Sequence, residues 1–280
     1  MNAFPSLQFL IDRLVAAVFD SALTAIFSAA VLLTVSLITA LLSWAKTSFP
    51  ARLALRLSDP NTTSFIVATV RSQRRPYRRV GSGLGEIRAI GVLVPIFMRA
   101  YKTFDGDRIL FSETVADGDP LHGNDVIILG GPKWNKIARQ FLEKMPTSLP
   151  YTMDTKGIID RMHGKRIDIS AIDGKITEDY GLVIKTKNPF NEKARCFLFA
   201  GVHTYGVHAA ALAFSSKLTR LRYLWCQNYA CLVRCDVTGE FIGRPEIVEF
   251  RRIKLKKDGG GGGVSTHEKQ SSTDRIVEEL

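Results

Sequence analysis

The sequence lacks the short motifs that mark several large classes of enzyme. It contains no HExxH zinc motif, no GxSxG nucleophile turn and no GxxxxGKS/T phosphate loop. A zinc peptidase, a serine hydrolase and a P-loop nucleotidase are therefore disfavoured. Cysteine is also scarce: Cys196, Cys226, Cys231 and Cys235 form no CxxC pair and have no histidine at ligand spacing. We expect reduced, partly buried thiols.

Acidic residues are fewer than basic ones, and the formal net charge is +11. The excess is concentrated between Lys46 and Arg99, where Asp59 and Glu86 are the only acidic residues. Such a charge suits nucleic acid, an anionic lipid surface or a phosphorylated small molecule, and charge alone does not choose among them. The sequence has no specific nucleic-acid module, such as paired aromatic strand motifs.

Charged residues are absent from Ser21 to Ala45. Because about 20 apolar residues cross a bilayer as a helix, residues 21–45 are predicted to form a transmembrane helix. A cleaved signal peptide is one alternative, but its apolar region would be only about 7–15 residues long and would follow a basic start. A buried core helix is the other, although small domains rarely need so long an uncharged run.

The basic residues around this segment predict its orientation. Arg13 stands alone before it, whereas Lys46, Arg52 and Arg56 follow it closely. Since basic residues are retained on the cytoplasmic side, we expect a single-pass protein of the cell membrane whose large domain is cytoplasmic and whose first partner is the lipid bilayer.

Five segments are expected along the chain. Residues 1–20 precede the transmembrane helix at 21–45. Residues 46–63 form a basic juxtamembrane linker, whose RLALRL segment could contact lipid headgroups. Residues 64–257 form an α/β domain, and residues 258–280 form a flexible, glycine-rich and polar tail.

Within the domain, apolar β-branched runs alternate with helical spacing, and a polar insert occupies 148–177. This predicts an α/β fold of Rossmann-like character, with a mostly parallel sheet, helices on both faces and a C-terminal β-hairpin. Pro95 is expected to kink or split its helix. The predicted strands are 64–70, 108–112, 125–129, 180–186 and 196–200, the helices are 87–101, 137–144 and the run after Gly206, and the hairpin is 229–237 with 247–253.

Three strands lead into glycine-rich turns, and ligands bind beyond the carboxyl ends of parallel strands. The first turn contains Gly81, Gly83 and Gly85, whose bare backbone N–H groups at a helix start could hold a phosphate. Arg74, Arg75, Arg78 and Arg79 precede it and could reach that phosphate or face lipid. The spacing is not GxGxxG, so an ordinary glycine loop explains the pattern equally well.

Glu86 enters the helix directly after this turn. A carboxylate is favoured in the first turn of a helix by the helix dipole alone. The alternative is a role as a ribose ligand, a general base or a nucleophile.

The second turn contains Gly130, Gly131, Pro132 and Asn135. Its glycines allow the backbone to approach a ligand, and the Asn135 amide could bind a polar group. A helix start needs such a turn in any case.

The third turn contains Gly201, His203, Tyr205 and Gly206, and His203 and Tyr205 could supply polar or stacking contacts. Asn188, in an earlier Asn-Pro-Phe-Asn turn, is a further candidate for ligand binding. A histidine outside a metal cluster is often structural, and the Asn188 turn is equally compatible with a plain connection.

The order of turns, GSGLGE, LGGPKWN, KNPFN and FAGVHTYG, resembles bacterial membrane-anchored or free-standing Rossmann-like domains. Some of these domains belong to nucleotide-based signalling and conflict systems, and their architecture is similar to the fold shared by TIR, SIR2-like and nucleoside deoxyribosyltransferase domains. The resemblance covers about residues 64–253. No catalytic motif matches residue by residue, so the resemblance implies a nucleotide or NAD-like ligand rather than a reaction.

Three hypotheses follow. The leading one is a membrane-anchored domain that binds a nucleotide or NAD-like ligand, as a receptor or a signalling or defence effector. The second is an N-glycoside hydrolase that acts on such a ligand, with Glu86 as its acidic residue and His203 as a further polar group. The third is a structural or partner-binding membrane protein. The first two require the three glycine turns to meet at one cleft.

Overall fold

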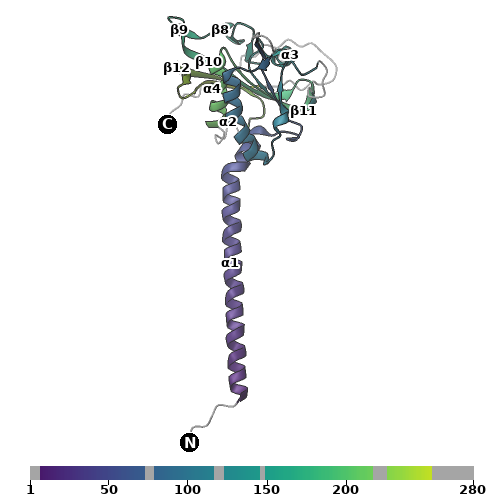
Figure 1. The fold of residues 1–280 in the computed structure, drawn as a ribbon, viewed down its shortest axis with the longest axis vertical. Coiled ribbons are helices and arrows are strands. Elements are labelled where there is room, and N and C mark those ends of the chain that lie inside the picture. The colour runs from purple at the N-terminus through teal and green to yellow at the C-terminus, as the bar shows by residue number, and fades with distance from the viewer. Residues whose placement is uncertain (1–6, 73–78, 117–122, 146–148, 217–225, 254–280) are drawn as a thin grey trace, which may run out of the picture.

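The structure is a computed structural model that describes residues 7–72, 79–116, 123–145, 149–216 and 226–253. The predicted tail and the side chains of Arg74, Arg75, Arg78 and Arg79 lie outside what it describes. A mixed α/β domain stands at one end of a long helix (Figure 1). The α-helices of the described residues are α1 (Leu7–Leu55), α2 (Leu84–Tyr101), α3 (Lys136–Lys144) and α4 (Thr204–Ser216).

The main sheet is partly parallel. The strands run in the order β13-β12-β10-β11-β5-β1-β4, with β14 paired to β12 and β9 paired to β10. These strands are β1 (Ser64–Val67), β4 (Ile109–Phe111), β5 (Val126–Leu129), β9 (Ser170–Ile172), β10 (Lys175–Asn188), β11 (Asn191–Gly201), β12 (Tyr229–Thr238), β13 (Phe241–Ile242) and β14 (Glu246–Arg252).

The prediction of a mostly parallel sheet is therefore wrong for half of it. Strands β4, β1, β5 and β11 are parallel neighbours, whereas β10 is antiparallel to both β11 and β12, and β12 is antiparallel to β14. The reason is the short connection after Asn188, because two or three residues can join only antiparallel strands.

Helices cover both faces of the sheet. Phe65 and Val67 of β1 pack with α2, α4 and the end of α1, whereas Ile66 packs with α3 on the other face. Because successive strand residues point to opposite faces, a strand covered on both sides is mostly apolar, as in β5 and, after Ser64, in β1.

Helix α1 is long and apolar enough, by length and composition, to cross a membrane. It continues past Ala45 and through Pro50 to Leu55, so the first ten residues of the predicted linker are helical. Ala51, Ala54 and Leu55 are almost completely buried in the core of the domain. Residues 51–55 of the predicted linker are thus part of the domain core, and this end of α1 packs on α2.

Helix α2 is not split at Pro95 but runs unbroken from Leu84 to Tyr101. Proline removes one helical N–H, and the carbonyl that loses its partner is that of Gly91. Gly91 is exposed, so water can satisfy this carbonyl.

Two smaller sheets complete the described chain. Strands β2 (Val70–Ser72) and β3 (Arg79–Gly81) form an antiparallel ribbon before α2. The polar insert contains β6 (Tyr151–Met153), β7 (Ile158–Asp160) and β8 (Lys165–Ile167), which pair antiparallel, while Gly106–Arg108 is a 3-10 turn before β4.

Candidate functional site

A cavity of about 360 Å³ lies at the carboxyl ends of β1, β5 and β11. We call it the turn-lined cavity, because all three glycine turns and the turn between β6 and β7 contribute to its wall. Its volume falls within the roughly 300–1,000 Å³ of small-molecule sites. The candidate residues that line it are Gly83, Glu86, Gly131, Pro132, Gly201 and His203.

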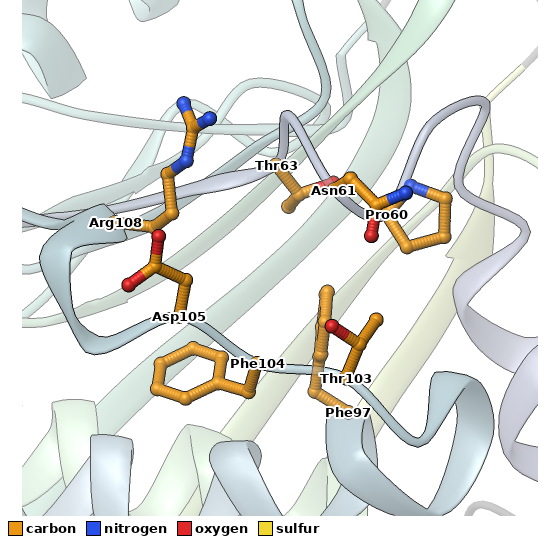
Figure 2. A pocket seen from close by; sticks show the side chains of 8 residues that line it. All are labelled: Pro60, Asn61, Thr63, Phe97, Thr103, Phe104, Asp105 and Arg108. Atoms are coloured by element: carbon orange, nitrogen blue, oxygen red, sulfur yellow. The ribbon is translucent and has the colours of Figure 1, made fainter.

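A second cavity, of about 220 Å³, lies at the opposite edge of the sheet (Figure 2). Its lining includes Pro60, Asp105 and Arg108, from the segments before β1 and β4, and Phe97 of α2. None of the candidate residues lines it. Among the described residues, its wall has no buried side-chain polar atom without a hydrogen bond, so it is a weaker site candidate.

Glu86 is the central side chain of the turn-lined cavity. It is only 8% exposed, and its carboxylate lies between Gly83 and Gly130. A Cβ atom at Gly130 would come within 2.9 Å of Glu86 Oε1, and one at Gly83 would overlap Oε2. Gly130 also has φ +96°, a conformation that favours glycine. Both glycines are therefore needed where they stand, because Glu86 fills the space beside them.

The carboxylate of Glu86 is incompletely hydrogen-bonded. Its Oε2 atom is buried and has no hydrogen-bond partner among the described residues. Burial raises the pKa of Glu86 above its ordinary value, and hydrogen bonding to its own backbone N–H lowers it in part. A carboxyl group in this position can accept a hydrogen bond from a ligand and holds a proton more readily than an exposed one.

The first glycine turn is not a bare phosphate cradle. The Gly85 N–H donates to Thr204 Oγ1 at 2.7 Å, and a Cβ atom at Gly85 would overlap the Thr204 backbone. Gly81 ends β3, pairs with Val70 and does not line the cavity. Since the Glu86 carboxylate already occupies the positive end of α2, a phosphate there would be repelled.

The third turn is held by a carboxylate that sequence analysis did not select. Asp179, which is fully buried in β10, accepts hydrogen bonds from the N–H groups of His203 at 3.1 Å and Gly206 at 2.6 Å. Burial raises the Asp179 pKa and these N–H donors oppose the rise. Tyr205 does not line the cavity, and its hydroxyl donates to the Gly239 carbonyl. The start of α4 is therefore also occupied by a protein carboxylate.

Asn135 has a structural role. It is fully buried, and its amide donates to the carbonyls of Leu129 at 2.9 Å and Ile66 at 3.3 Å. Its Oδ1 atom accepts from the Ala138 N–H at 3.0 Å and caps α3. The amide is fully used by these contacts, so the interpretation that it binds a ligand is not supported.

Asn188 lies at the other edge of the sheet, away from the turn-lined cavity. Its amide donates to the Asn124 carbonyl at 2.6 Å, and its Oδ1 atom accepts from the Phe190 N–H at 2.9 Å. These contacts close the hairpin between β10 and β11. Asn188 is therefore too far along β10 to join the other candidates.

Two residues at the cavity wall, Lys133 and Trp134, belong to the second turn but were not selected from the sequence. The sequence shows only that a lysine and a tryptophan directly follow Gly-Gly-Pro. What makes them candidates is their exposure at the cavity, and exposure depends on the fold, so the sequence alone did not reveal them.

The remaining wall comes from the insert, through Asp154, Thr155 and Gly157. Asp154 forms a two-point ion pair with Arg166, at 2.7 and 2.8 Å, which holds the pKa of this carboxyl far below its usual range. Its Oδ1 atom also accepts the Gly157 N–H at 3.0 Å. These bonds fix the shape of the turn that closes the cavity.

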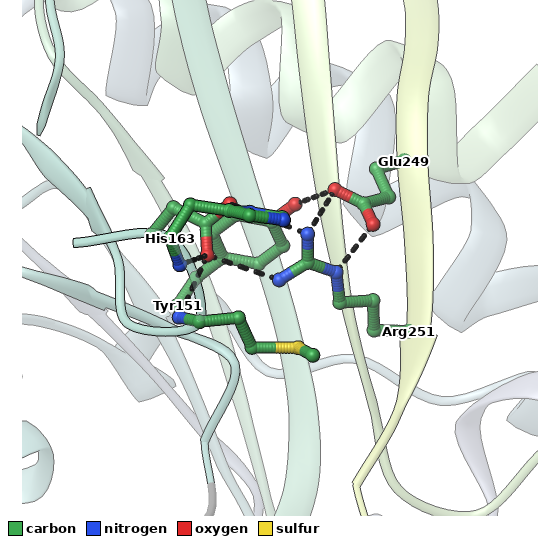
Figure 3. Close-up of polar contacts among 6 residues, drawn as sticks. Tyr151, His163, Glu249 and Arg251 are labelled. Atoms are coloured by element: carbon green, nitrogen blue, oxygen red, sulfur yellow. Dashed lines mark hydrogen bonds and ion pairs between the residues drawn. The ribbon is translucent and has the colours of Figure 1, made fainter. Parts of the chain in front are cut away.

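The insert is fastened to the main sheet by Arg251 of β14 (Figure 3). The Arg251 guanidinium donates to both oxygens of Asp160, at 3.0 and 3.2 Å, and also pairs with Glu249. Glu249 accepts the Tyr151 hydroxyl, and the guanidinium lies 4.7 Å from the centre of the Tyr151 ring. A bidentate pair of this kind fixes orientation, so β6 and β7 hold their turn against the cavity.

No metal site is evident in the part of the chain that the structure describes. None of its histidine, cysteine, aspartate and glutamate side chains gathers in a group of three or more that could hold a metal ion. The four cysteines are free and buried, as the sequence predicted.

Comparison with known proteins gives one similarity. No protein-family model and no solved structure matches the chain. Over 140 residues it is 27% identical to an uncharacterized protein of Methanocaldococcus jannaschii. The match covers 49% of this chain and 27% of the relative, so the chain spans about a quarter of the relative's length. The name of that relative states no activity and assigns none to this chain.

Proposed function

We propose that this protein is anchored in the cell membrane by α1 and binds a nucleotide or NAD-like ligand in the turn-lined cavity. The proposal includes a Rossmann-like origin of the domain, in line with the resemblance to TIR, SIR2-like and nucleoside deoxyribosyltransferase domains, and a role as a signalling or defence effector.

The observation that carries the proposal is the buried Oε2 atom of Glu86. A buried polar atom without a hydrogen bond is costly, so native structures rarely leave one unless a ligand or water satisfies it. A sugar hydroxyl or a base N–H can donate to this oxygen, whereas an ionised phosphate cannot. The sugar or amide part of a nucleotide therefore fits this end of the cavity.

The convergence of the three turns favours a ligand over a purely structural role. Gly83 and Glu86, Gly131 and Pro132, and Gly201 and His203 come from three different turns and line the same cavity. Scattered turns would have favoured the structural hypothesis instead.

The membrane arrangement is supported by the length of α1 and by the basic residues that follow its uncharged segment. Helix α2 extends from Glu86 at the cavity to Tyr101, whose hydroxyl accepts the Leu57 N–H at 3.1 Å beside the end of α1. At about 1.5 Å per residue, α2 separates the cavity from that end by roughly 25 Å. In the proposed orientation the cavity thus opens toward the cytoplasm, away from the bilayer.

An N-glycoside hydrolase is the second candidate, and the position of the buried Glu86 carboxyl group at the cavity favours it. Cleaving a bond between a sugar and a base calls for a carboxylate that stabilises or attacks the sugar carbon, or that activates water. Glu86 is the buried carboxylate of the cavity, and the exposed His203 is a polar group at its wall.

Substitution of Glu86 tests both candidates. Purified full-length protein is incubated with NAD and common nucleotides, binding is measured by calorimetry, and products are followed by chromatography. Glu86→Gln keeps the shape and one acceptor oxygen, so binding should persist while any turnover stops. Glu86→Ala removes the acceptor and should weaken binding by about ten- to hundredfold, as expected for a hydrogen bond to a charged group.

Glu192→Gln is the matched control, because Glu192 is exposed at the opposite edge and pairs only with Lys187 among the contacts described. Wild-type binding without turnover would leave the binding function and remove the hydrolase. Equal turnover in wild type and Glu86→Gln would exclude Glu86 from catalysis. Failure of the wild type to bind any nucleotide would overturn both candidates.

A further inference from the structure

We infer that Trp134 and Lys133 recognise the base and the phosphate of a nucleoside phosphate at the wall of the turn-lined cavity. The inference rests on the proposed function and names the parts of the ligand that the cavity distinguishes.

Trp134 presents an aromatic surface to solvent at the cavity. Its side chain is 57% exposed although it lines the cavity wall. Its backbone is fixed, because its carbonyl accepts the Thr69 N–H at 2.9 Å and its N–H donates to the Gly131 carbonyl at 3.3 Å. A large ring on a rigid turn gives a flat ligand group a surface to stack on at little cost in conformational entropy.

Lys133 places a positive charge beside this ring. Its Nζ atom lies 5.5 Å from the centre of the Trp134 ring and it also lines the cavity. No ion pair joins Lys133 to an acidic side chain among the described residues, whereas Arg166 near the same wall is fully engaged by Asp154. Lys133 is therefore available to pair with a phosphate while the base occupies the ring.

A phosphate cannot bind at the helix starts beside the cavity, so the wall formed by Lys133 and Trp134 is the place for it. Glu86 occupies the start of α2, and Asp179 occupies the start of α4. A phosphate at either position would meet a carboxylate or a buried N–H that is already bonded. The structure thus assigns the hydroxyl-bearing sugar to Glu86 inside the cavity, and the base and phosphate to the outer wall.

The experiment compares three probes. AMP contains base, sugar and phosphate, ribose 5-phosphate lacks the base, and adenosine lacks the phosphate. Binding of each probe to the full-length protein is measured by calorimetry for wild type, Trp134→Ala, Trp134→Phe and Lys133→Gln. Phe241→Ala is the matched control, because Phe241 is also an exposed ring, on β13, and does not line the cavity.

Trp134→Ala should weaken AMP and adenosine binding by roughly five- to 150-fold, the range for removing a base–aromatic stack, and leave ribose 5-phosphate unchanged. Trp134→Phe should restore most of the loss. Lys133→Gln should weaken AMP and ribose 5-phosphate by about the same factor and leave adenosine unchanged, and Phe241→Ala should change none of them.

If the wild type binds AMP and Trp134→Ala binds it equally well, the inference is wrong while the proposed function stands. The inference is also overturned if Trp134→Ala weakens AMP and ribose 5-phosphate by one common factor, because the ring would then only support the cavity. If the wild type binds none of the three probes, the inference fails, whereas the proposed function fails only if the wild type also binds neither NAD nor any common nucleotide.

Discussion

The buried Lys185 joins the end of α1 to the sheet and should give the domain an unusual dependence of stability on pH. Lys185 is fully buried in β10, its ammonium group donates to the Ala54 carbonyl in the last turn of α1, and its Nζ atom lies 5.5 Å from the centre of the Phe197 ring. Burial first, and the positive charges of Arg195 and Arg56 after it, lower the pKa of Lys185 from 10.5 to about 7.

The sign of the effect follows from where the unfolded chain binds more protons. Between pH 7 and 10.5 the unfolded chain keeps a proton on Lys185 that the folded chain has released, so the free energy of unfolding rises with pH across this window. The full shift corresponds to ~5 kcal/mol, and the part between about pH 6 and pH 9 to ~3 kcal/mol. Below about pH 7 the cost of burying the charge is present in full.

The assay is urea unfolding of the full-length protein in detergent, followed by tryptophan fluorescence at several pH values. Lys185→Met removes the titrating group while keeping the apolar stem, so the difference between wild type and variant should change by ~2–3 kcal/mol from pH 6 to pH 9. Lys187→Met, in the same strand but paired with exposed Glu192 at 2.9 Å, should show no such change. Identical pH profiles for wild type and Lys185→Met would refute the reasoning.

Two further predictions concern the core and the third turn. A fragment that starts at Ser64 lacks Ala51, Ala54 and Leu55, whose burial contributes ~3–5 kcal/mol to the free energy of unfolding. It should therefore unfold at lower urea concentration and less cooperatively than a fragment that starts at Lys46. Equal midpoints for the two fragments would show that the end of α1 is dispensable. Asp179→Asn should destabilise the domain by ~1.5–3 kcal/mol. The carboxylate offers two acceptor oxygens to the N–H groups of His203 and Gly206, whereas an amide has only one. A thermal scan without a loss of melting temperature would contradict this.

The sequence located the strands well, and the reason is physical. Residues 64–67 and 126–129 are buried on both faces, so every position except Ser64 is apolar and β-branched residues are frequent. The direction of the strands was harder to predict, because it depends on what the connections allow. The four residues from Asn188 to Asn191 are too short for a parallel crossover, and this length was the signal that could have corrected the prediction.

The end of α1 was misjudged for a different reason. Pro50 and the turn residues near Asp59 suggested a linker, yet Ala51, Ala54 and Leu55 follow the spacing of one helical face. This face packs against α2, which is distant in sequence, so the pattern alone could not reveal that α1 ends inside the domain core.

Asp179 shows the same limit at the site. It lies within β10, and the N–H groups that it accepts belong to residues 24 and 27 positions later. Nothing in the neighbouring sequence distinguishes it from an ordinary strand carboxylate. Glu86 could be selected because its position after a glycine turn at the start of a helix is local information.

The glycine turns illustrate why a glycine pattern alone is ambiguous between ligand binding and packing. At Gly85 and Gly206 a Cβ atom would overlap backbone atoms of Thr204 and Tyr180, so these glycines allow two chain segments to touch. At Gly83 and Gly130 the overlap is with the Glu86 side chain instead. Gly130 also makes room for the Ala68 side chain. What marks a candidate site is therefore the buried carboxylate with an unbonded oxygen at a cavity, rather than the number of glycines.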